Sequence, residues 1–487
     1  MQYLIWTLPA LAVIGVIASG KAGTLAASII GLGLALIVAL GMAPGDFPLS
    51  EAATALARGV WIGWIVVPYI LGGLLFWQMA IRSGDAAMPV EDPTDRPLSR
   101  RRLLFTACFL IGPFAESATG FGIGIIGTMI LVRRLNVPVI YLLAFSLLSQ
   151  TMILWGGMGS GAIVAGAFAR TDPTGLAVHT SFFQVAFNIF WLPLFWRMAE
   201  KAGVPAGWRE RMSEALWLAA SLALVIGATA LLGPEIAMLA AYGPVIVLRY
   251  LVDERPDRAK LGLAFSRMLP FTCLIGWLVI TRLVRPFEAL LLETGKLTPF
   301  EGAPAWSPLY HAGTWLVVAA LLTAVLRRHT RALGPEIRTA WKTGKLAVLS
   351  IIIFSMMAEL LSGSGIANGL AVGIFAAMGD WAILLTPQLS AVFGALANSG
   401  NAANGLFMAS QVSLAVEAGF SVPAVIALQH AAALSLNMVG PVRMSIVCGL
   451  AGTPGREREM YRVMLPFALV VVGVLFAAAI LIISGVI

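Results

Sequence analysis

Residues 112–122 read GPFAESATGFG and interrupt an apolar segment that runs from residue 103 to residue 132. Irregular backbone at membrane depth is tolerated only where protein or a water-filled cavity surrounds it, so we expect a broken helix inside a larger assembly. Glu116 is the single charged residue of the segment. Intramembrane acids are costly and usually functional, which favours proton carriage or substrate contact. The alternative is a structural glutamate that caps the broken helix or pairs with a basic residue.

The whole chain has the composition of a membrane protein. Of its 487 residues, 59% are hydrophobic and 11% are charged, whereas a soluble domain carries about 25% charged residues. So few charges cannot form a soluble surface, which excludes a soluble enzyme, a nucleic-acid-binding protein and a disordered chain. The three cysteines lie in apolar runs without CxxC or CxxH spacing. We therefore expect no disulfide framework, no metal site and no cofactor.

About twelve apolar segments are long enough to cross a bilayer as helices. They are 3–19, 23–42, 59–81, 137–154, 181–198, 214–232, 235–251, 268–284, 309–326, 345–362, 422–440 and 463–486. The first lacks the basic start of a signal peptide and is expected to be a membrane helix. Four more apolar stretches are short or broken, namely 103–132, 156–169, 365–380 and 381–416.

Clusters of basic residues predict the orientation. They lie at 96–102, 133–134, 197–211, 249–260, 327–345 and 456–462. Placing them in the cytoplasm gives a multi-pass protein of the plasma (inner) membrane with both termini outside. Segment 103–132 then starts and ends on the cytoplasmic side, and segment 381–416 starts and ends outside. Segment 103–132 must then be a re-entrant hairpin or an unusually short helix pair. The predicted fold has two re-entrant hairpins, 103–132 and 381–416, while 156–169 and 365–380 stay unplaced.

An internal repeat appears when the chain is shifted against itself by 285 residues. Residues 117–121 then fall on 402–406, and Val137-Pro138 falls on Val422-Pro423. Two halves with oppositely inserted hairpins are typical of inverted-topology repeats, which place the binding site at the midplane. Chance alignment of apolar sequence is the alternative. The predicted division is N-terminal helices over 1–81, a first repeat over 103–251, middle helices over 268–362 and a second-repeat core over 381–487.

The two hairpin tips supply the candidate substrate contacts. A helix that restarts after a break presents free N–H groups, a natural cradle for a carboxylate. The second tip, at 398–405, adds neutral amide and hydroxyl groups that can hold a hydroxyl and a carboxylate, unless they merely join packed helices. The candidates are Ser117, Thr119, Gly120 and Gly122 on the first tip, and Ser399, Asn401, Asn404 and Gly405 on the second.

Two further polar residues lie in the last apolar segments. His430 can relay protons, as Glu116 can, because histidine titrates near physiological pH; it can equally be a satisfied helix contact. Arg443 can bind an anionic substrate through two parallel hydrogen bonds, or extend to the cytoplasmic edge of the membrane. Glu359 is a weaker candidate near the outer mouth.

These motifs resemble the L-lactate permease family, whose members carry lactate and glycolate. Residues 114–122 keep the family pattern at Glu116, Ala118 and 120–122, and 155–159 is a similar glycine-rich stretch. Residues 398–407 and 449–457 are similar to two later family motifs. In the first of these, the family's acidic and hydroxyl positions are replaced here by residues 400–403. The resemblance covers about residues 60–470.

The resemblance implies proton-linked symport of a small hydroxycarboxylate, with paired hairpins and an elevator-like movement. The expected fold is an all-α polytopic membrane protein, and its partners are a small organic anion, protons and the lipid bilayer. A homodimer is expected by analogy of fold. The sequence has no Walker A, HExxH or GxSxG motif, so we expect neither an ATP-driven pump nor an enzyme. A sodium-coupled carrier and an anion channel remain alternatives.

Overall fold

The fold is all-helical. A computed structural model describes residues 2–82, 97–120, 122–152 and 155–487. Within these ranges there is no β-strand, and a single isolated bridge pairs Leu297 with Trp306. Ten helices in the described part are long and apolar enough to cross a membrane. The predicted all-α membrane class is therefore confirmed, whereas the predicted number of about twelve spans stays a prediction.

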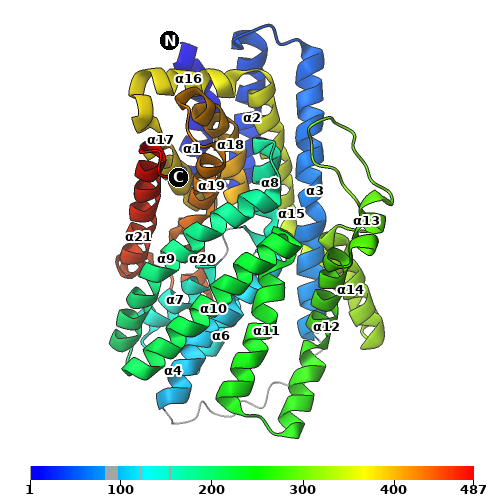
Figure 1. Cartoon of the computed structure of the whole chain (residues 1–487), viewed down its shortest axis with the longest axis vertical. Coiled ribbons are helices and arrows are strands. Elements are labelled where there is room, and N and C mark those ends of the chain that lie inside the picture. The colour runs from blue at the N-terminus through cyan, green and yellow to red at the C-terminus, as the bar shows by residue number, and fades with distance from the viewer. Residues whose placement is uncertain (1, 83–96, 121, 153–154) are drawn as a thin grey trace.

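The elements follow one another along the chain (Figure 1). They are α1 (Gln2–Ala18), α2 (Thr24–Met42), α3 (Leu49–Arg82), α4 (Pro97–Thr106), the π-helix η1 (Ala107–Ile111), α5 (Gly112–Thr119), α6 (Ile123–Arg133), α7 (Val139–Leu147), η2 (Leu148–Gln150), η3 (Gly157–Gly159), α8 (Ser160–Ala169), α9 (Pro173–Lys201), α10 (Trp208–Leu232), α11 (Pro234–Glu254), α12 (Arg258–Leu283), α13 (Arg285–Glu293), α14 (Ala312–Leu326), η4 (Thr330–Ala332), α15 (Leu333–Gly363), α16 (Ile366–Met378), η5 (Gly379–Trp381), α17 (Ala382–Ala397), α18 (Gly400–Ala418), α19 (Val422–Ser435), η6 (Asn437–Val439), α20 (Pro441–Leu450) and α21 (Glu457–Ile483).

Hairpin 1 consists of α4, η1 and α5 on the way in and α6 on the way out. Arg100 near its start donates from Nη2 to the carbonyl of Leu135 just beyond its end, at 2.5 Å. Its two feet therefore lie side by side, as a re-entrant hairpin requires. Pro113 does not break the inward arm, because the wider π-helical turn before it accommodates a residue without an N–H group. The chain turns later, at residues 120–122.

Hairpin 2 consists of α17 and α18, which pack against each other and turn at residues 398–399. In Figure 1, α4 lies at the lower end of the molecule and α17 at the upper end. The two hairpins therefore extend into the bundle from opposite ends. The segments 156–169 and 365–380, which the sequence leaves unplaced, form η3 with α8 and α16 with η5; α8 and α16 both pack against α18.

The long helices α3 and α15 pack closely against each other. A Cβ atom at Gly59 would lie 2.3 Å from Cα of Met356, and one at Gly344 would lie 2.9 Å from the side chain of Leu71. At Gly59, where the neighbouring atoms are backbone, only glycine allows this approach. Gly59 and Gly344 are 285 positions apart, and so are Leu71 and Met356. The contact of Gly59 with Met356 and the contact of Gly344 with Leu71 are therefore equivalent under the shift of 285 residues that aligns the sequence with itself.

Helix bounds follow the same shift. α3 and α15 begin at Leu49 and Leu333, and α4 and α17 begin at Pro97 and Ala382. α6 and α18 end at Arg133 and Ala418, and α9 and α21 begin at Pro173 and Glu457. These intervals are 284 or 285 residues. The tips depart from the rule, because residues 120–122 correspond by number to 405–407, whereas the second turn lies at 398–399.

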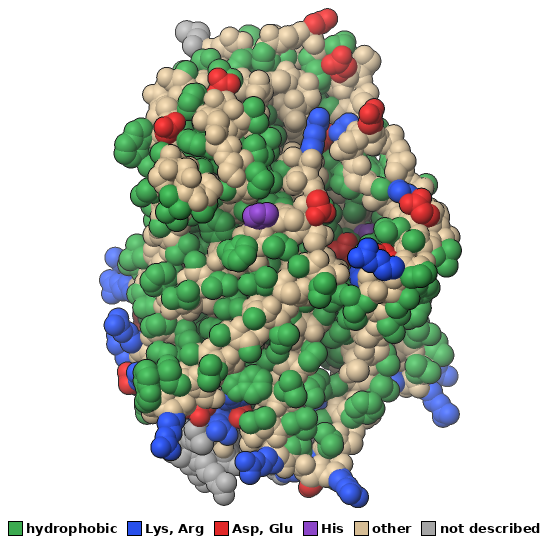
Figure 2. Space-filling view, viewed as in Figure 1, with side chains coloured by type: hydrophobic (Ala, Val, Ile, Leu, Met, Phe, Trp, Pro, Cys, Tyr) green, Lys and Arg blue, Asp and Glu red, His purple; other side chains and the backbone are tan. Residues whose placement is uncertain are grey.

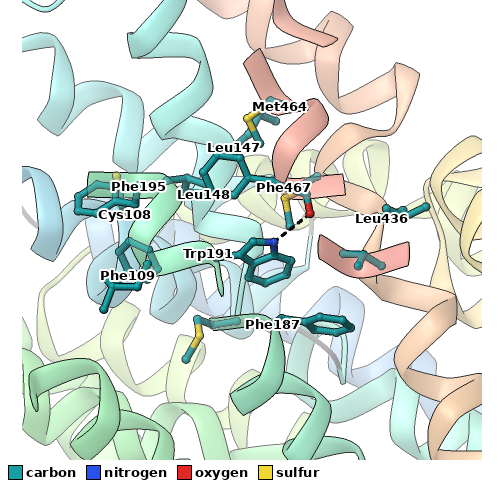
Figure 3. Close-up of a cluster of buried hydrophobic side chains, with 14 of the residues drawn as sticks. Cys108, Phe109, Leu147, Leu148, Phe187, Trp191, Phe195, Leu436, Met464 and Phe467 are labelled. Atoms are coloured by element: carbon teal, nitrogen blue, oxygen red, sulfur yellow. Dashed lines mark hydrogen bonds between the residues drawn. The ribbon is translucent and has the colours of Figure 1, made fainter. Parts of the chain in front are cut away.

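The two halves share a hydrophobic core (Figure 3). Trp191 on α9 is 1% exposed and donates from Nε1 to the carbonyl of Phe467 on α21 at 3.0 Å. Cys108 and Phe109 of hairpin 1 pack into the same cluster. Burial of the Trp191 ring adds a large apolar area to the core, and its one polar donor, the indole N–H, is hydrogen-bonded. In this cluster the inward arm of hairpin 1 packs with elements from both halves of the chain.

Basic side chains concentrate at the lower end of the molecule. Figure 2 shows Lys and Arg gathered there and most visible Asp and Glu higher up. Some are buried: Arg101 on α4 makes two hydrogen bonds to Glu214 on α10, at 2.6 and 2.8 Å, and both residues are at most 1% exposed. Removing one partner of such a pair leaves an uncompensated charge, which strongly destabilises a fold. The foot of hairpin 1 is therefore fixed to α10.

Candidate functional site

The tip of hairpin 1 is built on two glycines in the left-handed backbone region. Gly120 has φ 75° and ends α5, and Gly122 has φ 81° and precedes α6. Glycine adopts these angles without steric cost, which explains the GFG sequence of the motif. Phe121 between them lies outside the described residues. The tip contacts η3 closely, since a Cβ at Gly157 would lie 2.8 Å from the Gly120 nitrogen.

The Glu116 side chain fills the start of α6. Its Oε1 accepts the N–H of Gly122 and its Oε2 accepts the N–H of Gly124, both at 3.0 Å. The residue is fully buried. A carboxylate at a helix N-terminus satisfies free N–H groups and complements the helix dipole. The cradle that the sequence suggested for a substrate carboxylate is thus occupied, at this tip, by the protein's own carboxylate.

The tip of hairpin 2 has the same plan but an open helix start. Asn398 has φ 51° and ends α17, a position that asparagine tolerates. Ser399 caps α18, its Oγ accepting the N–H of Ala402 at 3.2 Å. The N–H groups of Gly400 and Asn401 have no acceptor among the described residues. The Asn401 side chain is partly exposed and makes no hydrogen bond in that part of the chain.

Arg443, in the first turn of α20, joins the two tips. Its Nη1 donates to Oε1 of Glu116 at 3.2 Å, and its Nε donates to Oδ1 of Asn398 at 2.9 Å. Nη1 also donates to Oε1 of Gln150. The residue is 8% exposed and lies inside the bundle, so extension to the membrane edge does not describe it. Its Nη2 makes no hydrogen bond with the described residues.

A second polar pair joins α18 and α19. Asn404 and His430 are fully buried, and Nδ2 of Asn404 lies 2.9 Å from Nδ1 of His430. The other polar atom of each, Oδ1 of Asn404 and Nε2 of His430, has no partner in the described ranges. Buried polar atoms are normally hydrogen-bonded, so these two require an explanation. Asn404 lies one helical turn beyond the open start of α18.

The other predicted site residues make contacts within the protein in this conformation. The hydroxyls of Ser117 and Thr119 donate to carbonyls of their own helix, those of Phe114 and Ala115. Gly405 is buried, and a Cβ there would lie 3.5 Å from Phe168. Glu359 accepts a hydrogen bond from Arg58 at 3.0 Å, and no hydrogen bond joins it to either tip in the described residues.

Sequence reasoning missed two acceptors of Arg443. Asn398 was seen only as part of a polar motif, and Gln150 was not singled out. A signal for Gln150 was present, because it is a polar residue near the end of an apolar segment. Its partner is 293 positions away, and only the fold brings such residues together.

Comparison with known proteins gives a consistent result. The family model described as L-lactate permease matches residues 294–486. The L-lactate permease of Salmonella typhimurium is 23% identical, covering 86% of this chain and 84% of its own. The glycolate permease GlcA of Escherichia coli is 22% identical, covering 89% and 86%. The solved structure of the YdaH transporter of Alcanivorax borkumensis is 15% identical, covering 93% and 89%, with a TM-score of 0.44.

By its helices the chain is a multi-pass membrane protein, and the curated relatives that it resembles are permeases, which are transporters and not enzymes. The chain is similar to the L-lactate and glycolate permeases over most of its length, and the predicted resemblance is confirmed.

Proposed function

We propose that this protein is a secondary transporter that moves a small organic anion, such as lactate, glycolate or a related hydroxycarboxylate, together with a proton. The relatives named L-lactate permease and glycolate permease support the substrate class. The observation that carries the proposal is the position of Arg443. It is a buried cation in contact with both hairpin tips, and one of its nitrogens is unengaged by the described residues.

The proposed anion site lies at the start of α18. The free N–H groups of Gly400 and Asn401 and the Asn401 amide follow directly after Asn398, which Arg443 contacts. A carboxylate there would accept hydrogen bonds from a helix N-terminus and from a guanidinium, both of which favour negative charge. The amides of Asn401 and Asn404 remain for the substrate hydroxyl.

Proton coupling follows from competition for Arg443. Without substrate, Glu116 neutralises the guanidinium. An arriving anion takes over the guanidinium and places a negative charge near Glu116, which then favours its protonated form. Cation, anion and protonated acid together carry the same net charge as the empty site. One proton would therefore accompany one monovalent anion, and His430 is the second candidate for the proton.

Alternating access is proposed to use two inverted repeats. The repeated interval of helix bounds and the matched glycine contacts between α3 and α15 support this. The basic side chains at the lower end favour a cytoplasmic location for that end, with both termini outside. A binding site between oppositely inserted hairpins then lies near the midplane.

The test is uptake by purified protein in liposomes, with labelled lactate, glycolate and other short acids. Accumulation above equilibrium under an inward proton gradient, abolished by a protonophore, supports the proposal and ranks the substrates. Accumulation that requires sodium instead of a proton gradient replaces it with sodium coupling. Flux that never exceeds equilibrium and saturates poorly replaces it with a channel.

A further inference from the structure

A cluster of ionisable and aromatic side chains lies away from the hairpin tips, where α3, α11, α12 and α14 meet. Nη2 of Arg282 donates to Oε2 of Glu235 at 2.7 Å, and the arginine side chain is 1% exposed. The guanidinium lies 4.3 Å above the ring of Tyr310. Figure 2 shows acidic and basic side chains together near the position of α13. The transport mechanism above assigns no role to this cluster.

His311, just before α14, is the residue of this cluster that has a ring nitrogen without a hydrogen-bond partner in the described residues. It is 5% exposed, and its Nε2 donates to the carbonyl of Ile65 at 3.0 Å. This bond places the proton of the neutral ring on Nε2, so Nδ1 carries a free lone pair. Nδ1 has no hydrogen-bond partner in the described part of the chain. A buried, unpartnered lone pair in the same cluster as the Glu235 carboxylate is a favourable position for a proton.

The charges around His311 favour uptake of one proton. The groups that face it or its partners are Tyr69 from α3, Glu235 from α11, Arg282 from α12, Glu288 from α13 and Tyr310 from the preceding loop. The Tyr310 hydroxyl is neutral in the physiological range, as tyrosine ordinarily is. The two carboxylates of the cluster, on Glu235 and Glu288, then outnumber its one guanidinium, on Arg282, and a proton on His311 balances the charge.

The cluster is mechanically connected to hairpin 1. A Cβ at Gly159 of η3 would lie 2.6 Å from the carbonyl oxygen of Pro234, next to Glu235. The other end of η3 touches the tip at Gly120, as described above. On α3, a Cβ at Gly73 would lie 2.5 Å from the carbonyl oxygen of Ala118, and Tyr69 is one turn away, roughly 6 Å along the helix. Close contacts through η3 and α3 therefore connect the cluster to the tip of hairpin 1.

We propose that His311 and Glu235 form a second proton-binding site, which controls the rate at which hairpin 1 changes position. The proton enters from the solvent and binds Nδ1 of His311, and the Glu235 carboxylate stabilises the imidazolium. The affinity of the anion at Arg443 is unchanged. The rate-control part rests on the proposed transport function, whereas proton binding can be measured without transport.

The binding test uses the full-length protein in detergent with carbon-13-labelled histidine rings. The His311 signal, assigned by its loss in His311→Gln, is followed from about pH 8 to about pH 5. In Glu235→Gln the titration midpoint should fall by about one unit or more, because an opposite charge has been removed. A signal that does not titrate, or a midpoint equal in both proteins, overturns the proposal. The glutamine amide of His311→Gln can still donate to the Ile65 carbonyl, so the variant keeps that contact.

The rate test uses counterflow exchange in liposomes with equal pH on both sides. The wild-type exchange rate should change with pH over the range in which His311 titrates, and His311→Gln should flatten that profile with the same KM. His179→Gln, an exposed histidine on α9, is the matched control and should retain the wild-type profile. A wild-type profile in His311→Gln overturns rate control. If the wild type exchanges no acid, the transport proposal fails while the histidine titration still decides proton binding.

Discussion

Nη1 of Arg443 lies 3.2 Å from Oε1 of Glu116, and this ion pair connects residues that are 327 positions apart in the chain. Glu116 is fully buried and the arginine side chain is 10% exposed. A pair so poorly solvated cannot be separated at small cost unless another charged group replaces one partner. A substrate anion and a proton are such replacements, which is why the pair fits a coupled transporter.

Glu116→Gln should abolish accumulation driven by a proton gradient and leave counterflow exchange partly intact. Glutamine resembles the protonated acid in shape and charge, so Arg443 stays available for the anion while no proton can be exchanged. Proteoliposome uptake with and without a proton gradient measures both activities.

Glu359→Gln is the matched control for that experiment. Glu359 is also a buried acid paired with an arginine, Arg58, but no hydrogen bond in the described residues connects it to either tip. It should retain gradient-driven accumulation per folded molecule. Equal loss of accumulation and exchange in Glu116→Gln would instead show that Glu116 only holds the tip together.

Arg443→Lys should raise the KM for the anion by roughly 10- to 100-fold, since hydrogen bonds to charged groups contribute about 1.5–3 kcal/mol each. Lysine keeps the charge but cannot bond Asn398, Glu116 and a carboxylate from one planar fork. Initial rates over a range of lactate concentrations measure the effect. An unchanged KM would remove Arg443 from the anion site.

The feet of the two hairpins should be accessible from opposite faces of the membrane. Arg133→Cys and Trp381→Cys place exposed thiols at these feet, in a protein whose Cys108, Cys273 and Cys448 are replaced by alanine. In sealed right-side-out vesicles an impermeant maleimide should label only the cysteine at position 381. Both should react after permeabilisation; labelling of both before it contradicts the inverted insertion.

Gly59→Ala should destabilise the protein by about 1–3 kcal/mol, the usual effect of forcing a methyl group into a tight contact. The added Cβ would meet the backbone of α15, which cannot move as a flexible side chain can. Gly227→Ala on α10 is the control, because a Cβ at Gly227 would have no neighbouring atom within 4 Å in the described chain. It should be neutral or stabilising by up to about 1 kcal/mol. Thermal unfolding in detergent distinguishes the opposite signs.

The sequence was informative about the large features. The re-entrant form of 103–132 followed from Gly112-Pro113 and the flanking arginines, and the same parity argument predicted the hairpin at 381–416. Local composition was sufficient because a membrane interior penalises irregular backbone wherever it occurs. Glu116 and Arg443 also stood out as charges in apolar surroundings.

What the sequence did not provide are the contacts made by those charges. The sequence offered a helix cap or a basic partner for Glu116 as an alternative, but it did not show that the capped helix is α6 or that the partner is Arg443, 327 positions away. The second turn lies several residues earlier than the aligned motif predicts, because Asn398 adopts the left-handed backbone and Ser399 caps the next helix. His311 was not singled out, because it stands near the start of the apolar segment 309–326 and outside the motifs that carried the argument.

The close packing of α3 and α15 at Gly59 has a consequence for biogenesis. Gly59 emerges from the ribosome 285 residues before Gly344, and at typical rates of synthesis that interval lasts roughly 15 to 60 seconds. During this time α3 is inserted without α15, the helix that packs against its Gly59. The first half of the chain must therefore persist in the bilayer as an incomplete unit, with lipid or the insertion machinery covering the surface around Gly59 until α15 is inserted.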